Sequence, residues 1–553
     1  MKLVIVETPS QAKKLTDVLR EGWRVEPCYG MVRDLPTDKL GIDLDNDFRP
    51  TFTVAPGKGN LVRRLMKALR DCEAVYAATP PNREGEALAW HLLALSPDAK
   101  DKPIYRVLLH ALTPDAIRTA FATPRPLDMK LIEAHITNRI IERLIGWGVT
   151  AAARKTIDDK ASLSYGGMVA LLQMAQKEAV VTTFVSHPVW RASVVFERDG
   201  VSLTGNVFDV KGVPLIIQSE NQAHQLETLL QHGVYWVDKR GQTMQTLPPT
   251  GALTLVDLIE IAHDDLALTP EHVLSLVETL YEAGWITHPD ANFPFELSDA
   301  AEAYIRREYG ATYLNANTLL KGGIAPTDVS RVPEALPGDG ASVYALIWKY
   351  FIAAHMTAAQ TRLLGTRILV GATQGKRYPL EVRTVMSLPY FDGWRRVLPI
   401  ATADAALPAF PDGETFQGAE VVIEPVTRAA PAPYTAMSLA RSLVACGFST
   451  PSAASAVDSL ITAGYLTNDS ELSVTDSGRR LSTYLTETFN ELAYPLKVGE
   501  LHADMIRIES GKETRLDVLR AFWSRFGDAL RPAPVVRAAV EHKPIVLRPV
   551  EEV

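Results

Sequence analysis

The chain has 553 residues, of which 47% are hydrophobic and 22% are charged, and its formal net charge is −8. These values are typical of a globular protein, and the length predicts roughly three to five domains. No apolar run approaches the ~20 residues that span a bilayer, and the N-terminus lacks the layout of a signal peptide, so we expect a cytoplasmic protein with no membrane contact.

The cysteine spacing and the net charge indicate which kinds of functional site the chain is expected to contain. The three cysteines, Cys28, Cys72 and Cys446, lie far apart and form no CxxC pair, which argues against a zinc site or a redox motif. The negative net charge counts only mildly against nucleic-acid binding, because a local basic surface can coexist with an acidic exterior. One basic strip on a predicted helix is a candidate for such a surface, with a solvated helix face as the alternative: Arg63, Arg64, Lys67 and Arg70.

Residues 1 to about 125 alternate between strands and helices. The expected elements are, in order, strand Leu3–Val6, helix Gln11–Leu19, extended run Trp23–Tyr29, amphipathic helix Leu61–Leu69 and strand Val75–Ala78. This order predicts an α/β domain with a mostly parallel sheet.

The remainder of the chain changes its pattern several times. Apolar residues at helical spacing predict helices over 126–180, and alternating runs such as VWRASVVFE predict antiparallel strands from about 181. Residues 253–283 return to a helical pattern, strand-like runs reappear over 366–425, and a helical block follows from about 437. A helical insertion therefore interrupts a strand-rich region.

Two short segments repeat one another. Leu280–Thr287 reads LYEAGWIT and Leu460–Thr467 reads LITAGYLT. In each segment a predicted helix ends at a glycine, which favours a left-handed cap, and a short strand follows. Two winged-helix-like units would produce this pattern, and chance similarity is the alternative.

The most informative segment is VYAATPPNREGEALAWHL, residues 75–92. A short apolar strand leads into a Pro-Pro turn, which excludes a continuous helix. A helix then begins with Arg83, Glu84 and Glu86, and acidic residues suit the N-terminus of a helix electrostatically.

Several segments, in one order along the chain, resemble the type IA DNA topoisomerase family. In the first part of the chain, VIVETPSQAKK at 4–14 resembles the family's VIVESPSKAK, YGMVRDLP at 29–36 resembles its GHxxDLP, and REGEALAWHL at 83–92 is nearly identical to its sequence. Further along, IERLIGWGVTAAARKTI at 141–157 matches the entry to the family's gate helix, and LYEAGWITHPD at 280–290 resembles its LYExGxITYxR. Residues 432–467 resemble its YTExSLVxxLExxGIGRPSTYA block.

The resemblance implies a multidomain α/β plus α plus β fold, arranged as a toroid. Its expected parts are a Toprim domain at 1–125, a helical single-strand-groove domain at 126–180 and 429–530, a strand-rich arch at 181–248 and 365–428, a winged-helix-like domain at 249–364 and a Pro-rich tail at 531–553. Members of the family cut one DNA strand through a tyrosine ester, pass another strand through the break and reseal it.

The residues at the catalytic positions differ from the family's pattern. His288 stands where the family has its nucleophilic tyrosine, and Asp290 stands where it has a phosphate-holding arginine. Histidine attacks phosphorus in other enzymes, so one interpretation is that His288 acts as the nucleophile. The other is that His288 has no catalytic role. Tyr281 belongs to the preceding helix and cannot simply take over as nucleophile.

The metal-binding turn has also changed. The family's turn reads Asp-x-Asp-x-Glu and holds magnesium, and the corresponding positions here are Pro80, Asn82 and Glu84. Glu7 and Glu84 remain as candidate catalytic and metal-binding carboxylates. Because Mg²⁺ binds one or two protein carboxylates plus water and phosphate, a weak site is possible, and polar contacts within the domain are the alternative. We expect no zinc and no other cofactor.

Some positions that could meet DNA remain. The family's Arg-Arg pair corresponds to Asn138-Arg139, and the histidine of its AHxAIxPT motif corresponds to Gly322. Tyr165 and Trp147 could stack on bases, with core packing as the alternative for both. Basic residues that could contact phosphates are Lys13, Arg33, Lys58, Arg83 and Arg139.

The sequence therefore predicts a degenerate type IA topoisomerase homologue that binds DNA, which we expect to be single-stranded. A protein partner is a further candidate ligand. The protein would act as an accessory or scaffold in DNA metabolism, without strand cleavage or strand passage. One alternative is a divergent topoisomerase or single-strand nuclease that uses His288 with Glu7 and Glu84. Another is a protein-binding toroid with no DNA role.

Overall fold

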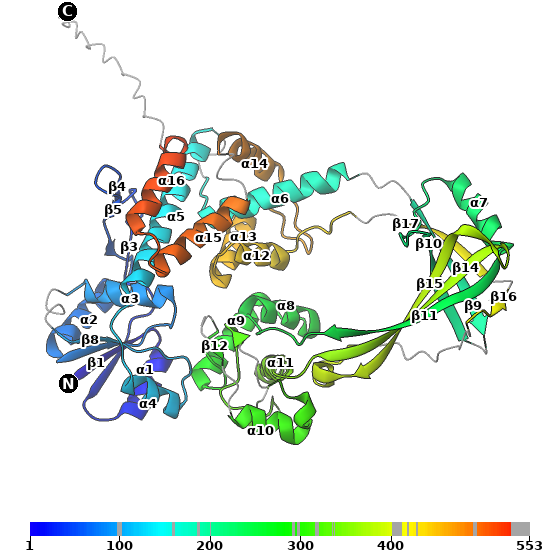
Figure 1. Ribbon diagram of the computed structural model, residues 1–553. Coiled ribbons are helices and arrows are strands. Elements are labelled where there is room, and N and C mark those ends of the chain that lie inside the picture. The colour runs from blue at the N-terminus through cyan, green and yellow to red at the C-terminus, as the bar shows by residue number, and fades with distance from the viewer. Residues whose placement is uncertain are drawn as a thin grey trace, which may run out of the picture. The chain divides into compact units, whose positions relative to one another are not determined.

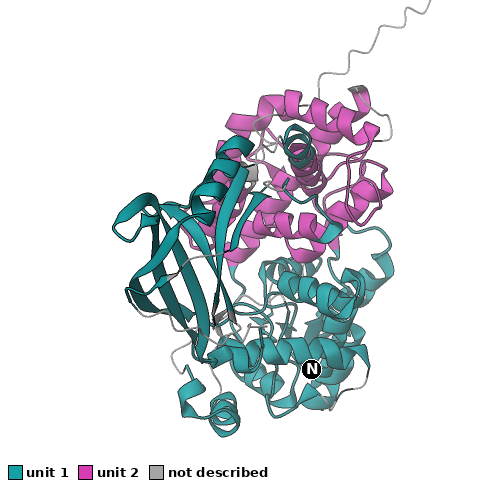
Figure 2. Ribbon diagram, turned by 90° about the vertical axis from the view of Figure 1, so that its right-hand side faces the viewer, with its two compact units in different colours: residues 1–32, 54–128, 177–437 teal, residues 33–53, 129–176, 438–553 magenta. Residues whose placement is uncertain are grey.

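The computed structural model describes residues 1–96, 102–156, 161–184, 189–198, 201–289, 294–295, 299–315, 320–333, 336, 338–400, 412–416, 420–426, 430–489 and 495–531. The chain folds into two compact units (Figure 2): unit 1 comprises residues 1–32, 54–128 and 177–437, and unit 2 comprises residues 33–53, 129–176 and 438–553. Among the described residues, no helix combines the length and apolarity needed to cross a membrane. Apart from Arg531, the predicted Pro-rich tail lies outside the described residues.

The N-terminal part of unit 1 is a four-stranded parallel sheet with the strand order β2-β1-β7-β8 (Figure 1). Its strands are β1 (Lys2–Val6), β2 (Trp23–Pro27), β7 (Ala74–Ala77) and β8 (Ile104–Arg106), and its helices are α1 (Pro9–Leu19), α2 (Gly59–Asp71), α3 (Arg83–Leu93) and α4 (Pro114–Ala122). The α/β layout is the one that the alternating pattern predicts.

The alternation of side chains along β1 explains why helices cover both faces of this sheet. Val4 and Val6 belong to the same buried cluster as Leu15 of α1. Leu3 and Ile5 belong to a second buried cluster, to which α2 and α3 contribute. Successive side chains of a strand point to opposite faces, so an all-apolar strand needs a helical layer on each side.

A helical part of unit 1 packs against the first of these clusters. Its elements are α8 (Leu255–Leu266), α9 (Pro270–Ala283), α10 (Asp299–Glu308), α11 (Asp339–Ala354), the short strands β12 (Pro294–Phe295) and β13 (Leu320–Lys321), and the 3₁₀ helices Ala311–Tyr313 and Gly393–Arg396. Val4 and Leu112 of the sheet domain lie in one apolar cluster with Leu280 and Ile352 of the helical part. The two parts therefore share a hydrophobic core.

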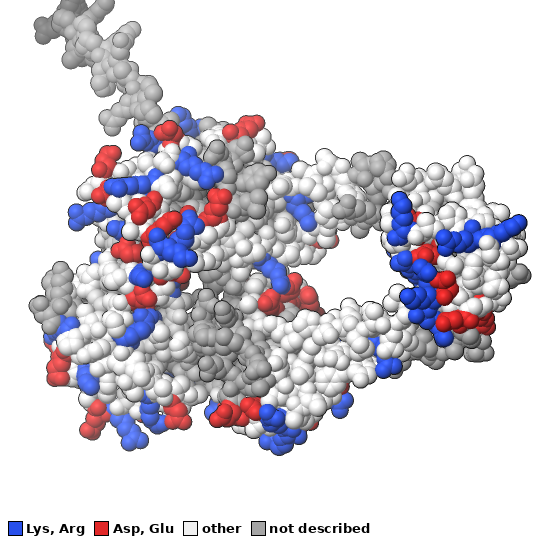
Figure 3. Space-filling model, viewed as in Figure 1, with Lys and Arg blue, Asp and Glu red and all other residues white. Residues whose placement is uncertain are grey.

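The rest of unit 1 is built on a seven-stranded sheet with the order β16-β11-β14-β15-β10-β9-β17. Its elements are β9 (Val189–Arg198), β10 (Val201–Asp209), helix α7 (Glu220–Gln231), β11 (Val234–Leu247), β14 (Ala359–Thr373), β15 (Lys376–Phe391), β16 (Thr415–Phe416) and β17 (Glu420–Val426). On the face shown in Figure 3, Lys and Arg side chains of this sheet are interleaved with Asp and Glu. Ion pairs such as Arg240 with Asp412, at 2.8 Å, neutralise part of this charge.

Unit 2 is mainly helical. The helices from which it is built are α5 (Met129–Thr156), α6 (Tyr165–Thr183), α12 (Ala436–Ala445), α13 (Thr450–Thr462), α14 (Asp476–Thr488), α15 (Pro495–Glu509) and α16 (Arg515–Leu530), and the short strands in or beside residues 33–53 are β3 (Arg33–Asp34), β4 (Ile42–Asp43), β5 (Arg49–Pro50) and β6 (Thr53–Val54). On α5, Gly148 lies so close to α16 that an added Cβ would be 2.7 Å from the Leu530 carbonyl oxygen.

The structure groups residues 33–53 with unit 2, whereas the sequence assigns them to the first domain. The physical reason is a set of polar contacts to the helices of that unit. Arg139 of α5 binds Asp34 through two nitrogens, at 3.0 and 2.8 Å, and Arg520 of α16 binds Asp47 at 2.8 Å. The other predicted domain boundaries stay predictions.

The two segments that repeat each other in the sequence also share their local structure. Gly284 and Gly464 have φ angles of 80° and 74°, in the left-handed region. In each segment the residue after the glycine donates its N–H to the carbonyl five residues back, at 2.9 Å. A threonine hydroxyl donates to each glycine carbonyl at 2.7 Å, from Thr327 in one and Thr475 in the other. The repeat is therefore structural, and the winged-helix interpretation of it stays a prediction.

We expect Gly284→Ala to destabilise the protein more than Gly464→Ala. Each substitution places a Cβ in the left-handed region, at a cost of roughly 1–2 kcal/mol. At Gly284 the new Cβ would also lie 3.2 Å from the Leu112 carbonyl oxygen, whereas at Gly464 no heavy atom of the described residues lies within 4 Å. Thermal unfolding of the two variants beside the parent chain measures the difference, and equal losses would contradict the close contact at Gly284.

Candidate functional site

The Pro-Pro turn between β7 and α3 is tightly closed. Asn82 caps α3, and its side-chain Oδ1 accepts a hydrogen bond from the N–H of Gly85 at 2.8 Å. A Cβ on Gly85 would lie 1.9 Å from the carbonyl oxygen of Pro80, so the turn closes only when residue 85 is glycine. The side-chain oxygen at position 82 is therefore already used to start the helix.

A buried ion pair holds the backbone of the same turn. Arg106 is 0% exposed and Glu86 is 1% exposed, and the Nε of Arg106 donates to Glu86 at 3.0 Å. The Nη1 of Arg106 donates to the carbonyls of Ala77, Thr79 and Val107 at 3.0, 2.9 and 2.8 Å. Burial lowers the pKa of Arg106 to about 10, with the Glu86 carboxylate opposing that effect. Arg106 therefore remains charged at neutral pH.

Sequence reasoning did not identify Arg106, although a signal was present. A single arginine ends the apolar run Ile104–Arg106 and precedes a second apolar stretch, where an isolated charge needs a buried partner. Nothing in the linear sequence indicates that this partner is Glu86, twenty positions earlier in the chain.

The two candidate carboxylates approach each other from different elements. Glu7 follows β1 and is half-buried, whereas Glu84 lies in the first turn of α3 and is exposed. Burial raises the pKa of Glu7, and repulsion from Glu84 and Glu278 raises it further, while Lys58 opposes the rise. The structure therefore brings Glu7, Glu84 and Lys58 within electrostatic range of one another.

This donor set does not fit the family's three-carboxylate magnesium site. Pro80 offers no side-chain ligand, and the carbonyl oxygen of Pro80 accepts a hydrogen bond from Arg106. Asn82 offers a neutral oxygen that already caps α3. Across the described residues, no group of three or more His, Cys, Asp or Glu side chains is placed to hold a metal ion.

The side chain of Gln11 is a further difference that sequence reasoning passed over. It stands where the family's opening wording VIVESPSKAK has a lysine. Gln11 is 8% exposed, and its Oε1 accepts the N–H of Glu7 at 3.2 Å. A neutral amide thus occupies the place of a cation beside the carboxylate.

His288 is held by backbone contacts next to the sheet domain. Its N–H donates to the carbonyl of His110 at 2.8 Å, and its ring lies edge-on to Tyr281 with 4.9 Å between the ring centres. Burial lowers the pKa of His288 to about 4, and His110 adds to the effect. The imidazole of His288 is therefore neutral at pH 7. Asp290, which stands where the family has a phosphate-holding arginine, lies outside the described residues.

The hydroxyl of Tyr281 is held inside the protein. Tyr281 is 5% exposed, and its hydroxyl donates to the carbonyl of Leu109 at 3.0 Å. Burial raises its pKa well above the ordinary range, with Glu7 and Glu282 adding repulsion. The hydroxyl therefore stays protonated and bound to the backbone.

Glu282 joins α9 to α1. The hydroxyl of Thr8 donates to the carboxylate of Glu282 at 2.5 Å, and the Nζ of Lys14 donates to its backbone carbonyl at 2.9 Å. These contacts and the shared core place the end of β1, the Pro-Pro turn and His288 in one region of unit 1.

The predicted DNA-binding residues divide between the two units. In unit 1, Lys13 is exposed on α1, Arg83 is half-buried at the start of α3, and the half-buried Lys58 donates to the carbonyl of Tyr29. Each remains a prediction as a phosphate contact.

In unit 2, Arg33 lies over the ring of Phe52 at 5.7 Å, and burial lowers the pKa of Arg33. Arg139 is bound by Asp34. Tyr165 is 7% exposed, and its ring lies 5.3 Å from that of Phe448. These three residues of unit 2 likewise remain predictions as DNA contacts.

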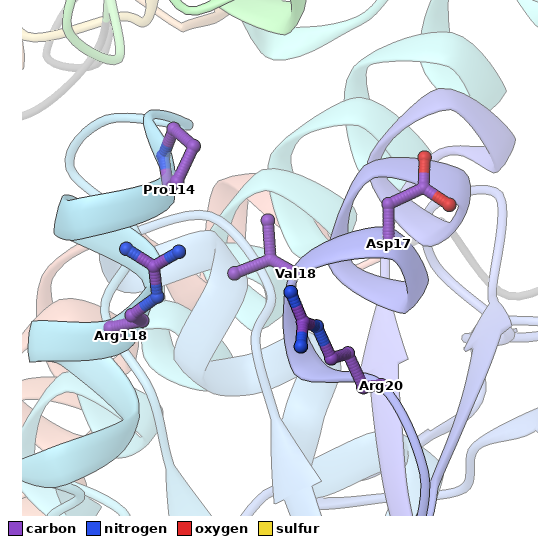
Figure 4. Close-up of a pocket in the computed structure, with 5 residues that line it drawn as sticks. All are labelled: Asp17, Val18, Arg20, Pro114 and Arg118. Atoms are coloured by element: carbon purple, nitrogen blue, oxygen red, sulfur yellow. The ribbon is translucent and has the colours of Figure 1, made fainter.

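A surface groove lies elsewhere on the sheet domain, between α1 and α4. It has a volume of about 530 Å³, and its lining residues, shown in Figure 4, are Asp17, Val18, Arg20, Pro114 and Arg118. None of the predicted site residues lines this groove.

Comparisons with known proteins agree with the geometry. Residues 2–112 match the family described as Toprim domain, and residues 126–520 match the family described as DNA topoisomerase. The chain is 27% identical to DNA topoisomerase 1 of Zymomonas mobilis subsp. mobilis, over 95% of this chain and 46% of that protein. It is also 27% identical to DNA topoisomerase 1 of Vibrio cholerae, over 96% of this chain and 66% of that protein. The chain thus spans about half to two thirds of the length of these relatives.

A solved structure shares the fold. Full-length topoisomerase I from Thermotoga maritima matches with a TM-score of 0.81 and 24% identity, over 96% of this chain and 90% of that chain. The predicted fold class is confirmed.

We expect the stability of the folded chain to fall as the pH drops from about 6.5 to about 4, and His288→Asn to remove part of this loss. The pKa of His288 is about 4 in the fold, whereas an unfolded imidazole titrates near about 6.5. Between these values the unfolded state binds a proton that the folded state does not, so acid favours unfolding. Above this window both states are neutral and the histidine adds no pH dependence.

Urea unfolding of His288→Asn and of the exposed-site control His224→Asn, at about pH 7 and about pH 5, measures this dependence. The control should follow the parent chain. The same acid sensitivity in all three proteins would show that His288 does not sense the burial described.

Proposed function

The chain belongs to the type IA DNA topoisomerase family, and we propose that it is a DNA-binding member that does not cut DNA through a tyrosine ester. Its proposed role is that of an accessory or scaffold in DNA metabolism, on single-stranded DNA in the cytoplasm. The observation that carries this proposal is the half-buried imidazole of His288, whose backbone N–H is bound to the His110 carbonyl, at the position that corresponds to the family's nucleophile.

The residues at and beside position 288 do not favour cleavage through a tyrosine ester. Cleavage through a tyrosine ester needs a hydroxyl that attacks phosphorus and holds the cut end covalently. Position 288 supplies an imidazole instead, and the neighbouring Tyr281 binds the Leu109 carbonyl with its hydroxyl. A tyrosine ester would therefore require Tyr281 to leave its buried site and lose that bond.

The carboxylates of the candidate site support the same proposal. The family's magnesium chemistry would rely here on Glu7 and Glu84, without an acid at positions 80 and 82. Burial and repulsion from Glu84 and Glu278 raise the pKa of Glu7, and the nearby Lys58 opposes this rise only in part. We therefore derive no step of a reaction through a metal in this chain.

DNA binding is supported by the family and by the cations that remain around the turn. Lys13, Lys58 and Arg83 lie on or beside elements that flank Glu7. Contacts of this kind provide affinity for phosphates without reading the base sequence. The proposed DNA ligand therefore needs no specific sequence.

One observation favours a second candidate, a divergent topoisomerase or single-strand nuclease. Neutral imidazole is the nucleophilic form of histidine, and the lowered pKa keeps His288 in that form at pH 7. Attack on phosphorus would form an N–P bond, with the departing DNA oxygen taking a proton. The ring of His288 is half-buried and lies edge-on to Tyr281, which opposes the approach of a phosphodiester from that side.

We expect the chain to leave negatively supercoiled plasmid unchanged in the presence of Mg²⁺, and to form no covalent adduct with a labelled strand after denaturation. A labelled single strand should nevertheless bind, with an affinity that falls as salt rises. Relaxation or nicking that is lost in His288→Ala would overturn the proposal in favour of the second candidate. Absence of any salt-sensitive binding would remove the DNA role and favour a protein-binding function.

We expect Mg²⁺ to leave the thermal unfolding of the parent chain unchanged, and Glu7→Gln to raise the unfolding temperature at neutral pH. The raised pKa of Glu7 means that the folded state is most stable with this carboxyl protonated and loses stability as the pH rises through that pKa. The neutral amide avoids this loss. A bound metal would stabilise the native state by mass action, so a Mg²⁺-dependent rise that Glu84→Gln abolishes would contradict the prediction.

A further inference from the structure

Helix α2 carries a basic face that the candidate site does not use. Arg63, Arg64, Lys67 and Arg70 are all exposed on this helix, and Asp71 at its end is its one acidic residue. Arg63, Lys67 and Arg70 follow the i, i+4, i+7 spacing that places side chains on one helix face. The opposite face is buried in the core of the sheet domain, through Val62, Leu65, Ala68 and Leu69.

Little negative charge opposes this basic face. Arg64 pairs with Glu26 at 3.2 Å, and Arg63 binds the neutral amide of Asn60. Within the part of the chain that the structure describes, no acid forms an ion pair with Lys67 or Arg70.

The seven-stranded sheet shows the opposite arrangement. Several of its arginines are paired with acids: Arg367 with Asp238, Arg383 with Glu381 and Arg240 with Asp412. The α2 face is therefore a cationic surface without matching anions, on a chain whose net charge is −8.

The charges at the N-terminal end of α2 do not favour the helix. Its first turn contains no acid, and Lys58 occupies the N-cap without a side-chain cap bond. Positive charge at this end opposes the helix dipole, and the like charges of Arg63 and Lys67 lie one turn apart. At the other end Arg70 and the Nζ of Lys102, which donates to the Leu69 carbonyl at 2.7 Å, suit the helix dipole, so the unfavourable charge lies in the N-terminal half. An anionic ligand would relieve this repulsion.

We propose that the exposed face of α2 binds the phosphate backbone of duplex DNA. Arg63 and Arg70 are seven residues apart, which is about 10 Å along a helix that rises about 1.5 Å per residue. One strand of a duplex presents a phosphate about every 3.4 Å along its axis, so this face spans about three phosphates. A duplex carries charge on two strands over the same length, so this fixed row of cations binds a duplex more tightly than a single strand.

The proposal rests on DNA binding as the proposed function and extends it. It assigns duplex DNA to α2, on the outside of the sheet domain, and leaves single-stranded DNA to other residues. Contacts of this kind hold the backbone without reading its sequence.

The test compares two triple variants of the full chain that have equal net charge. In Arg63→Gln/Lys67→Gln/Arg70→Gln the α2 face is neutral. In the control, Arg306→Gln/Arg307→Gln/Lys349→Gln, the same number of exposed charges is lost from α10 and α11. Fluorescence anisotropy with a labelled duplex and the matching single strand, over a range of salt concentrations, reports both affinities.

We expect the α2 variant to lose at least about tenfold in duplex affinity at low salt, and its slope of log K against log salt to become shallower by about 2–3, at about 0.9 per phosphate contact. Single-strand binding and the control variant should match the parent chain. Equal duplex binding by the α2 and control variants would overturn the proposal.

Two other outcomes separate this proposal from the proposed function. A parent chain that binds the single strand but no duplex would overturn the role of α2 and leave the proposed function standing. A parent chain that binds neither would overturn both. Loss of poly-L-glutamate binding in the α2 variant, with duplex binding retained, would assign the face to an acidic protein and overturn the proposal.

Discussion

The buried ion pair between Arg106 and Glu86 is the constraint from which the rest of the sheet domain is arranged. A charge without a partner in this interior would be very costly, and removal of one partner from a buried pair typically costs about 3–5 kcal/mol. Arg106 satisfies the carbonyls of Ala77, Thr79 and Val107, which fixes the ends of two neighbouring strands. Glu86 in turn accepts from Arg125 and from the N–H of Asp128, where the chain leaves the sheet domain. One pair thus joins the turn, a strand and the exit of the domain.

This constraint makes the turn independent of the side chains at positions 80 and 82, where the resemblance predicts acids in the family. Arg106 binds backbone carbonyls of the turn, so the side chain at position 80 contributes nothing to these bonds. The cap at position 82 needs only a short oxygen acceptor, which asparagine provides. Gly85 and Glu86 have no such freedom, because one is packed against the Pro80 carbonyl and the other is the partner of Arg106. The motif thus keeps the residues that the turn requires, Gly85 and Glu86, and differs from the family at positions 80 and 82, where the turn tolerates other side chains.

The same division applies around position 288. The segment Thr287–His288 is held by the N–H of His288, which donates to the His110 carbonyl, and by Thr287, whose N–H donates to the Ala325 carbonyl and whose hydroxyl accepts the Ala325 N–H. These contacts do not depend on which ring stands at 288. The shared hydrophobic core and the Thr8–Glu282 bond then keep this segment beside the sheet domain. The backbone arrangement of the site therefore does not depend on the side chain at position 288, and the basic face of α2 is not part of it.

The sequence by itself determined the order of the elements, the α/β layout and the family, because side-chain periodicity, the Pro-Pro turn and glycine caps act over a few neighbouring residues. It also showed which residues differ from the family's sequence motifs, such as Pro80 and His288. Only the tertiary structure decided what these residues experience. It pairs Arg139 with Asp34, buries Tyr165 against Phe448 and lowers the pKa of His288. Ion pairing, burial and pKa depend on groups that are distant in the chain and become neighbours only when the core is formed.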